Sequence, residues 1–387
     1  MTIKSKETSL FIKLSLALGL TSLATPALAI DLLTGEKNGA YYNDFCPAIK
    51  SAVKDKNLLV DCRTSNGSLH NLDTVIDNPT HFGLAQYDLF SLKYSHESNQ
   101  LLYTPVRDDL GKECLFLVTK NKKMTNFGDI VASAPYMNFI LPPETSGHAG
   151  TFKYLQSIDK NGLGKATKVT FVESTEAAIT QALANEDNVT LFVQFPNPDN
   201  KHFKLVNDNG GHFIPVISKE VLSQTTRGNK VYSAEETSVA NPNWTESGKK
   251  LVTACTPIVM FTGKSMRVTD NAMKDEHSKA ITILQETPAE KLRPKKGWLS
   301  QLWTSTKAVS AKSAETLVET TEKAKEASSP YLAKAKEVTK DAIEAAKPTY
   351  EKAKEATKSV LEKAKDLGEK AINGAGKGIE KNTTPQQ

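Results

Sequence analysis

Polar loops that follow predicted strands are the places in this sequence where binding chemistry could occur. Gly67 and Ser68 open a predicted helix, with Ser68 expected as its N-cap, and the backbone N–H groups there favour an anion. In open α/β sheets, ligands bind at the carboxyl ends of strands and at helix N-termini. Five loops occupy such places: residues 34–42, 64–71, 86–88, 146–151 and 194–197.

Sequence signatures of metal sites and of common enzymes are missing from the chain. The seven histidines are scattered without an H-x-x-x-H pair, and the four cysteines lack C-x-x-C spacing. Neither a P-loop nor an H-E-x-x-H motif occurs, and Ser146 is not part of a G-x-S-x-G elbow. We therefore expect no metal, no cofactor and no enzymatic activity.

The elements that must position these loops alternate between strands and helices. A β-α-β-α-β order favours a parallel sheet with right-handed crossovers, and a second similar unit follows the first. Two such units predict an α/β protein with two lobes around a cleft. The predicted strands are residues 30–34, 58–62, 82–86, 114–119, 138–141, 169–172, 189–194 and 256–262, and the helices are 41–53, 68–76, 148–157, 175–184 and 269–284.

The first 29 residues have the pattern of a cleaved signal peptide. Three lysines precede an apolar run at residues 14–24, and Ala27 and Ala29 form an A-x-A cleavage site, so the mature chain is expected to begin at Ile30. A retained membrane anchor is the alternative, but the run is short for a membrane span. The sequence thus predicts an exported, periplasmic protein.

Charge is unevenly distributed along the 387 residues. Residues 30–290 contain 26 basic and 30 acidic side chains, whereas residues 291–387 contain 20 basic and 13 acidic ones. The net charge of the whole chain is only +5, which does not indicate a nucleic-acid-binding protein. The hydrophobic content of 39% is enough to build a substantial core.

Four cysteines form an even set in a chain that is expected to reach an oxidising compartment: Cys46, Cys62, Cys114 and Cys255. They allow three pairings, and the sequence alone does not choose among them. Four buried free thiols are the alternative.

The segment T-G-E-K-N-G-A-Y-Y is similar to the pattern T-G-G-x-x-G-x-Y-Y, and T-S-N-G-S-L-H-N-L is similar to T-x-G-S-x-x-N-L. Together with three further motifs in the same order, they resemble the motifs of TAXI-type solute receptors, the extracytoplasmic binding proteins associated with TRAP transporters. The resemblance covers residues 30 to about 288. The motifs lie at residues 34–42, 64–72, 82–88, 146–151 and 193–198.

The resemblance implies a type II periplasmic-binding-protein fold, whose two lobes are joined by two hinge crossovers. Lobe one is then expected at residues 30–113 plus 256–290, and lobe two at residues 114–255. Cys114 and Cys255 would fall near the two crossovers, where a bridge between them could pin the hinge. Cys46 and Cys62 would link the first helix to the second strand.

The family resemblance also implies a small carboxylate or amino-acid ligand, such as glutamate or glutamine. Hydroxyls, amides and a cation are the groups that bind a carboxylate. The residues expected to contact the ligand are Lys37, Tyr41, Tyr42, Thr64, Asn66, Gly67, Ser68, Gln86 and Asp88 in lobe one, and Ser146, His148 and Thr151 in lobe two.

Three positions depart from the family pattern. Glu36 and Lys37 make the first loop bulkier and charged, and Lys37 is either a ligand contact or a solvated turn residue. His148 replaces a small residue. Asp88 could bind a ligand ammonium group or could cap the helix that follows it.

Residues 291–387 form a Lys-, Ala- and Glu-rich tail in which Ala-Lys or Thr-Lys pairs recur every 11 residues. An 11-residue repeat keeps a stripe nearly straight along a helix, and this segment resembles late-embryogenesis-abundant-like repeats. A solvated, partly helical extension is one reading. Trp298, Leu302 and Trp303, which follow four basic residues, suit contact with a membrane interface, or they pack back on the lobes.

Two functions follow from these features. The first is an exported receptor that captures a small solute by hinge closure and delivers it to a TRAP-type permease or a sensor. The second is an envelope-associated structural or surface protein that acts through its tail and has a vestigial cleft.

Overall fold

The computed structural model describes residues 28–95, 97–241, 248–295 and 307–327, together with positions 348, 355 and 358. Residues 1–27 of the predicted signal peptide lie outside this part, as do Trp298, Leu302 and Trp303. Within the described ranges, none of the helices is long and apolar enough to cross a membrane.

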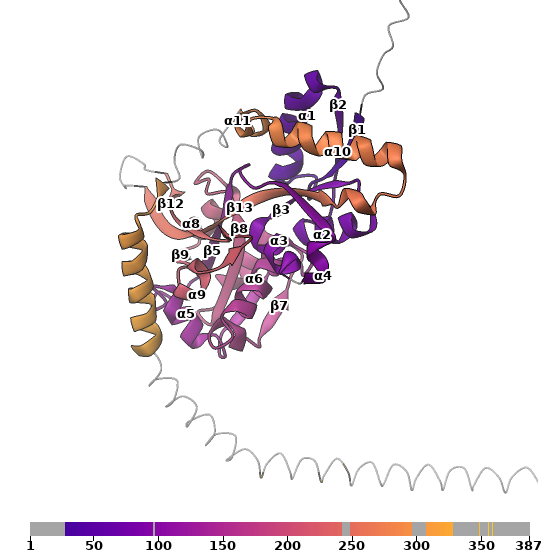
Figure 1. Ribbon diagram of the computed structural model, residues 1–387. Coiled ribbons are helices and arrows are strands. Elements are labelled where there is room, and N and C mark those ends of the chain that lie inside the picture. Colours follow the sequence, from indigo (N-terminus) through magenta and orange to yellow (C-terminus); the bar gives the residue numbers. More distant parts are fainter. Residues whose placement is uncertain are drawn as a thin grey trace, which may run out of the picture.

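Strands and helices alternate as the sequence predicts, and they form two lobes, with the first above the second in Figure 1. The first lobe contains β1 (Leu28–Leu33), η1 (Tyr41–Phe45), α1 (Cys46–Val53), η2 (Lys54–Lys56), β2 (Leu58–Arg63), α2 (Ser68–Asp77), β3 (Phe82–Gln86), α3 (Tyr87–Tyr94), α4 (Glu97–Gln100), β4 (Tyr103–Arg107), η4 (Ser265–Arg267), α10 (Asn271–Glu286) and α11 (Ala289–Leu292).

The second lobe contains β5 (Lys112–Thr119), α5 (Phe127–Ser133), β6 (Asn138–Leu141), α6 (Gly147–Ile158), η3 (Leu163–Lys165), β7 (Val169–Phe171), α7 (Thr175–Ala182), β8 (Asn188–Gln194), α8 (Lys201–Asp208), β9 (His212–Pro215), α9 (Lys219–Leu222), β10 (Thr225–Thr226), β11 (Asn229–Lys230), β12 (Ser233–Ala240) and β14 (Lys307–Ala308). The long strand β13 (Lys249–Gly263) belongs to both lobes.

One sheet path runs through both lobes in the order β2-β1-β3-β13-β5-β8-β6-β7. β1 is parallel to β2 and β3, as β-α-β units require, and β13 is antiparallel to β3. The end of β13 pairs with β3 and β4 of lobe one, whereas its beginning pairs with β5 and β12 of lobe two. This pairing confirms the two-lobed α/β architecture.

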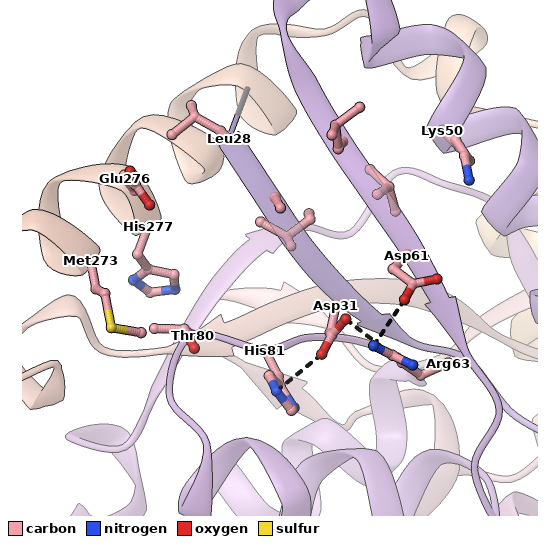
Figure 2. A pocket seen from close by; sticks show the side chains of 14 residues that line it. Leu28, Asp31, Lys50, Asp61, Arg63, Thr80, His81, Met273, Glu276 and His277 are labelled. Carbon is pink, nitrogen blue, oxygen red and sulfur yellow. Dashed lines mark hydrogen bonds and ion pairs between the residues drawn. The ribbon is translucent and has the colours of Figure 1, made fainter. Parts of the chain in front are cut away.

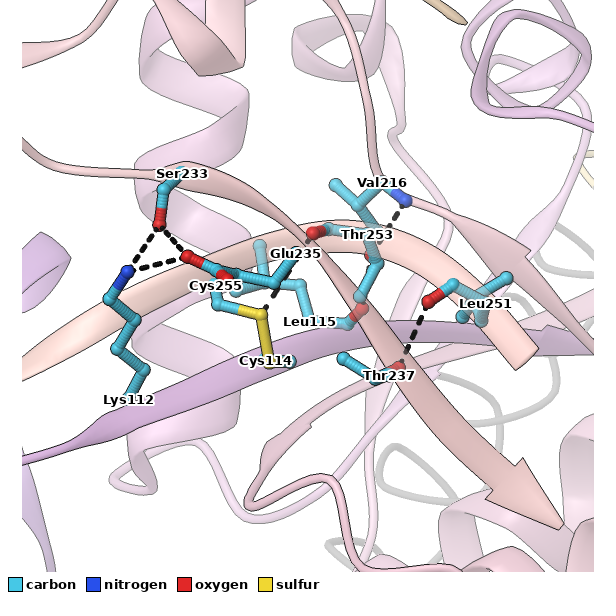
Figure 3. Close-up of a disulfide and its surroundings, with 10 residues drawn as sticks. All are labelled: Lys112, Cys114, Leu115, Val216, Ser233, Glu235, Thr237, Leu251, Thr253 and Cys255. Atoms are coloured by element: carbon cyan, nitrogen blue, oxygen red, sulfur yellow. Dashed lines mark hydrogen bonds and ion pairs between the residues drawn. A yellow bond between two sulfur atoms is a disulfide. The ribbon is translucent and has the colours of Figure 1, made fainter. Parts of the chain in front are cut away.

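The chain crosses between the lobes where β5 and β13 lie side by side and antiparallel. Cys255 is in register with Cys114 and Thr256 with Glu113, and the two cysteines form a disulfide at this crossing (Figure 3). Lys112 extends from the same crossing to Glu235 on β12, with Nζ and Oε1 2.5 Å apart. A second disulfide joins Cys46 of α1 to Cys62 of β2. Both pairings are those that the resemblance favoured.

The apolar core is continuous across the two lobes. One cluster of buried side chains includes Phe90 and Phe261 from lobe one together with Phe139 and Tyr232 from lobe two. A second cluster lies in lobe one but includes Phe195, which directly follows β8, and a third lies within lobe two. Because α3 and α6 also pack against each other across the junction, the structure represents a closed arrangement of the lobes.

Part of the predicted tail packs on lobe two instead of extending from it. β14 pairs with β12, and the helix formed by residues 311–327 runs down the left side of lobe two in Figure 1. A Cβ atom built on Gly128 of α5 would lie 2.2 Å from the Thr321 carbonyl oxygen, so glycine allows the two backbones to approach. Lys325 then reaches Glu220, with Nζ and Oε1 3.5 Å apart.

Candidate functional site

The first turns of α2 and α6 meet at the junction between the lobes. The N-cap of α2 is Gly67, with φ of 104°, so the expectation that Ser68 caps this helix is wrong by one residue. Glycine takes this place because the backbone conformation is one that other residues rarely adopt. A Cβ atom on Gly67 would lie 3.6 Å from the Gly147 nitrogen, so two helix N-termini, one from each lobe, face the same space.

Gln86 lies between these two helix ends. It ends β3, only 4% of its surface is exposed, and its Oε1 accepts a hydrogen bond of 3.4 Å from the Ser68 hydroxyl. A Cβ atom on Gly147 would lie 2.3 Å from the same oxygen. The amide oxygen therefore occupies the place at the start of α6 where the helix dipole favours negative charge.

Asp88 of lobe one binds two hydroxyl groups of lobe two. Its Oδ2 accepts hydrogen bonds from Thr151 Oγ1 at 2.7 Å and from Tyr232 Oη at 2.8 Å, while its Oδ1 accepts the Leu89 N–H. Burial raises the pKa of Asp88 above its usual value, and the two hydroxyl donors partly oppose that effect. These two hydrogen bonds connect the lobes, and we refer to Asp88 with its partners Thr151 and Tyr232 as the Asp88 latch.

A second buried carboxyl group lies at the crossing of the lobes. Glu113 Oε2 accepts a hydrogen bond of 2.8 Å from the Tyr41 hydroxyl. Burial raises the pKa of Glu113 to about 7; nearby Asp88 adds to the increase, whereas hydrogen bonds from Tyr41 and Gln86 lower the pKa. The pKa of Tyr41 is in turn raised well above its ordinary value, chiefly by burial.

Seven of the twelve predicted ligand-contacting residues are brought together at this junction: Tyr41, Gly67, Ser68, Gln86, Asp88, Ser146 and Thr151. Ser146 caps α6 by accepting the Ala149 N–H. Of the others, Lys37, Thr64 and Asn66 are exposed, and Tyr42 is half-buried. They stay predictions as ligand contacts.

His148 faces β8 of its own lobe. Its Nδ1 accepts a hydrogen bond of 3.0 Å from the Val193 N–H. Burial is the main cause that lowers the pKa of His148 to about 4, so the ring is neutral at physiological pH. This hydrogen bond connects the first turn of α6 to strand β8.

Glu113, Tyr232 and Thr256 belong to the junction but were not predicted as site residues. Thr256 accepts the Asp88 N–H at 3.2 Å. Glu113 gives no clear local signal, because a charged residue at the start of an apolar strand can equally well face solvent. Tyr232 gives no local signal, since it lies 144 residues away from Asp88 along the chain.

A separate pocket of about 580 Å³ lies on one face of β1 and β2, beside α10 (Figure 2). Arg63 pairs there with Asp31 and Asp61, and His81 lies 3.4 Å from Asp31. The charges compensate one another and are partly solvated, so they contribute little to stability. In the part of the chain that the structure describes, no group of three His, Cys, Asp or Glu side chains is arranged to hold a metal ion.

No protein-family model matches this chain, and no curated protein matches it either. Among solved structures, the chain is similar to an ABC-type phosphate transport receptor from Vibrio cholerae, with 12% identity over 68% of this chain and 96% of that one and a TM-score of 0.38.

Two further structures have comparable similarity. A structure of a periplasmic transporter shows 8% identity, 79% and 97% coverage and a TM-score of 0.38. A mutant of the OxyR2 regulatory domain from Vibrio vulnificus shows 11% identity, 68% and 97% coverage and a TM-score of 0.35. At these TM-scores the likeness assigns neither a ligand nor a partner to this chain.

Proposed function

We propose that this protein is an exported receptor that captures a small carboxylate or amino acid, similar to glutamate or glutamine, between its two lobes. The carrying observation is that the first turns of α2 and α6 meet at the end of β3. Gly67 and Gln86 of lobe one lie against Gly147 of lobe two there, and the Ser68 hydroxyl donates to Gln86. A ligand carboxylate would accept hydrogen bonds from the two helix N-termini and from the Ser68 hydroxyl.

Hinge closure would couple binding to a change of shape. The described chain has its lobe crossings at β4 to β5 and along β13, and the disulfide between Cys114 and Cys255 joins these strands. Lobes joined by so few strands can rotate about the crossing, although rotation would divide the apolar cluster that they share. The Asp88 latch would hold the closed form. The resemblance to TAXI receptors adds the proposal that a TRAP-type permease receives the ligand.

A structural or surface-interaction protein at the cell envelope is the second candidate. One observation favours it: the junction is filled by side chains of the protein itself. A Cβ atom on Gly150 would lie 2.9 Å from Leu89 and 3.0 Å from Leu69, both on the opposite lobe. A vestigial cleft would have this property, and the tail from residue 291 would then be the active part.

Thermal unfolding of the purified chain with millimolar glutamate, glutamine, other amino acids and small dicarboxylates distinguishes the two candidates. A ligand at 100 times its dissociation constant adds about 2.7 kcal/mol to the native state. We expect one compound to raise Tm by several degrees, and we expect Ser68→Ala to abolish that increase.

Ser174→Ala is the matched control, because Ser174 caps α7 by accepting the Ala177 N–H and lies outside the junction. It should lower Tm through the lost cap but keep the ligand-induced increase. No increase with any compound would contradict the receptor function and favour the envelope candidate.

A further inference from the structure

The junction between the lobes has two poles, one at each end of the Gln86 side-chain amide. One pole favours a hydrogen-bond acceptor, and the other favours a hydrogen-bond donor. At one pole, the N-termini of α2 and α6 favour negative charge, and the Gln86 Oε1 atom lies against Ser68 and Gly147 there. At the other pole lies the Glu113 carboxyl group, which accepts a hydrogen bond of 2.8 Å from the Tyr41 hydroxyl and whose pKa is lowered by the nearby Gln86 amide group, as a donor would lower it. One end of this side chain therefore acts as an acceptor and the other as a donor.

An α-amino acid, like this amide, has a hydrogen-bond acceptor at one end and a donor at the other. Its carboxylate accepts hydrogen bonds and its ammonium group donates them, a few bonds away. In the closed protein, the Gln86 amide thus fills a place whose surroundings match the main-chain groups of an amino acid. A simple carboxylate matches only the pole at the helix N-termini.

Among the described residues, the groups that act on the Glu113 carboxyl include no cation. Tyr41 of η1 and Gln86 of β3 donate hydrogen bonds to it, Asp88 of α3 adds negative charge, and its register partner on β13 is Thr256. The neighbouring Lys112 turns to the other side and binds Glu235 and Ser233. A buried carboxylate next to a second carboxylate is costly unless a cation is supplied.

We propose that Glu113 is the specificity-determining residue of the site and receives the ammonium group of an α-amino acid, so that the receptor selects amino acids over simple carboxylates. This inference rests on the proposed receptor function. An ammonium group placed at Glu113 forms a charge-assisted hydrogen bond. A ligand without an ammonium group leaves the buried carboxylate without a cation, and sites built to bind a polar group reject such analogues strongly.

If Glu113 binds the ligand ammonium group, ligand binding should change the protonation of Glu113. A purely structural Glu113 would not show this change. Glu113 titrates near neutral pH in the free protein, whereas a bound ammonium group would keep it ionised. Binding of an amino acid should therefore release a proton and become tighter from pH 6 to pH 8. A des-amino ligand should not show this increase.

Titration calorimetry of the full chain with glutamate against glutarate, and with glutamine against 4-carbamoylbutanoate, tests the proposal. We expect each amino acid to bind at least about tenfold more tightly than its des-amino partner. Glu113→Gln should remove that preference. Glu235→Gln should keep it, because Glu235 is a buried carboxyl group on β12 whose hydrogen-bond partners are Lys112 and Ser233. Two buffers of different ionisation enthalpy report the released proton on the wild-type protein.

The outcomes separate this inference from the function on which it rests. Equal affinity for both members of each pair, or a preference that survives Glu113→Gln, would overturn the role of Glu113 and leave the receptor intact. Binding of none of the four compounds would overturn the amino-acid receptor and this inference with it. If Glu113→Gln does not fold, the affinity ratio and the proton release of the wild-type protein still decide the matter.

Discussion

At the scale of single residues, the junction contains two buried carboxyl groups with different surroundings. The oxygens of Asp88 accept hydrogen bonds from the Thr151 and Tyr232 hydroxyls and from the Leu89 N–H. Glu113 accepts one from the Tyr41 hydroxyl and lies near the Gln86 amide. Burial is the first cause of the raised pKa in both. Both carboxyl groups thus bond across the lobes, Asp88 to Thr151 and Tyr232 of lobe two, and Glu113 to Tyr41 of lobe one.

The raised pKa of Glu113 predicts a pH-dependent stability. The folded protein binds a proton near pH 7 that the unfolded chain binds only near pH 4.5, so the free energy of unfolding should fall as pH rises through this window. The full effect is about 3 kcal/mol at most, because one pKa unit corresponds to about 1.4 kcal/mol. Glu113→Gln should flatten this slope, as measured by urea unfolding at pH 5 and pH 8.

Glu144→Gln is the control for this measurement, since Glu144 is exposed and pairs with Lys153 on the surface. An equally steep slope in the Glu113 variant and the wild-type protein would show that other groups, Asp88 among them, cause the pH dependence.

At the scale of elements, the described part of the tail is an integral piece of lobe two. β14 adds to the edge of β12, where the Val309 N–H also donates to the Ala234 carbonyl. The helix over residues 311–327 then crosses α5 at Gly128 and places Lys325 near Glu220 and Asp159. Any partner of the residues that follow would thus be attached through lobe two.

Gly128→Ala should release this helix from lobe two. The added methyl group would meet the Thr321 carbonyl oxygen, which is backbone and cannot rotate away as a side-chain end could. We expect limited proteolysis within residues 307–327 to become at least about fivefold faster, because the steric clash destabilises the docked state by about 1–3 kcal/mol.

Gly35→Ala is the matched control, since a Cβ atom on Gly35 has no heavy atom within 4 Å. Unchanged protection of residues 307–327 in the Gly128 variant would mean that α5 moves aside and that the helix is held by other contacts.

At the scale of the whole molecule, the structure is a closed pair of lobes with one shared apolar cluster. Opening would expose part of that cluster and would break the bonds from Thr151 and Tyr232 to Asp88. Ligand binding to a two-lobed receptor works only if the open and closed forms differ by a few kcal/mol. The latch is one of the contributions that set this difference.

Thr151→Val should shift the protein towards the open form. It removes a hydroxyl donor and leaves the buried Asp88 carboxylate with one donor fewer, at a cost of about 1–3 kcal/mol. We expect the radius of gyration from small-angle X-ray scattering to increase in the absence of ligand and to return to the wild-type value with a bound ligand.

Thr190→Val removes a buried hydroxyl that has no hydrogen-bond partner in the structure, and it should leave the radius of gyration unchanged. The same radius for the Thr151 variant and the wild-type protein would show that the Thr151 hydroxyl is not needed to hold the lobes closed.

The sequence by itself determined the alternating strands and helices, because period and turn chemistry are local properties. It predicted β2, β3, β6 and α6 to within one residue of their ends, and it located Ser68, Gln86 and Asp88 at strand and helix ends. It gave a helix after Asp88 only as an alternative and without bounds, it missed α5 and α8, and it began β1 two residues late, at the predicted signal cleavage site.

Only the tertiary structure decided which of these residues meet. Tyr232 reaches Asp88 from a distant part of the sequence, Glu113 is buried because β13 pairs with β5, and His148 is turned towards β8. The packing of residues 307–327 on lobe two likewise depends on Gly128, far away in the chain. Such contacts are set by how the lobes close and by backbone approach, which leave no periodic pattern in the sequence.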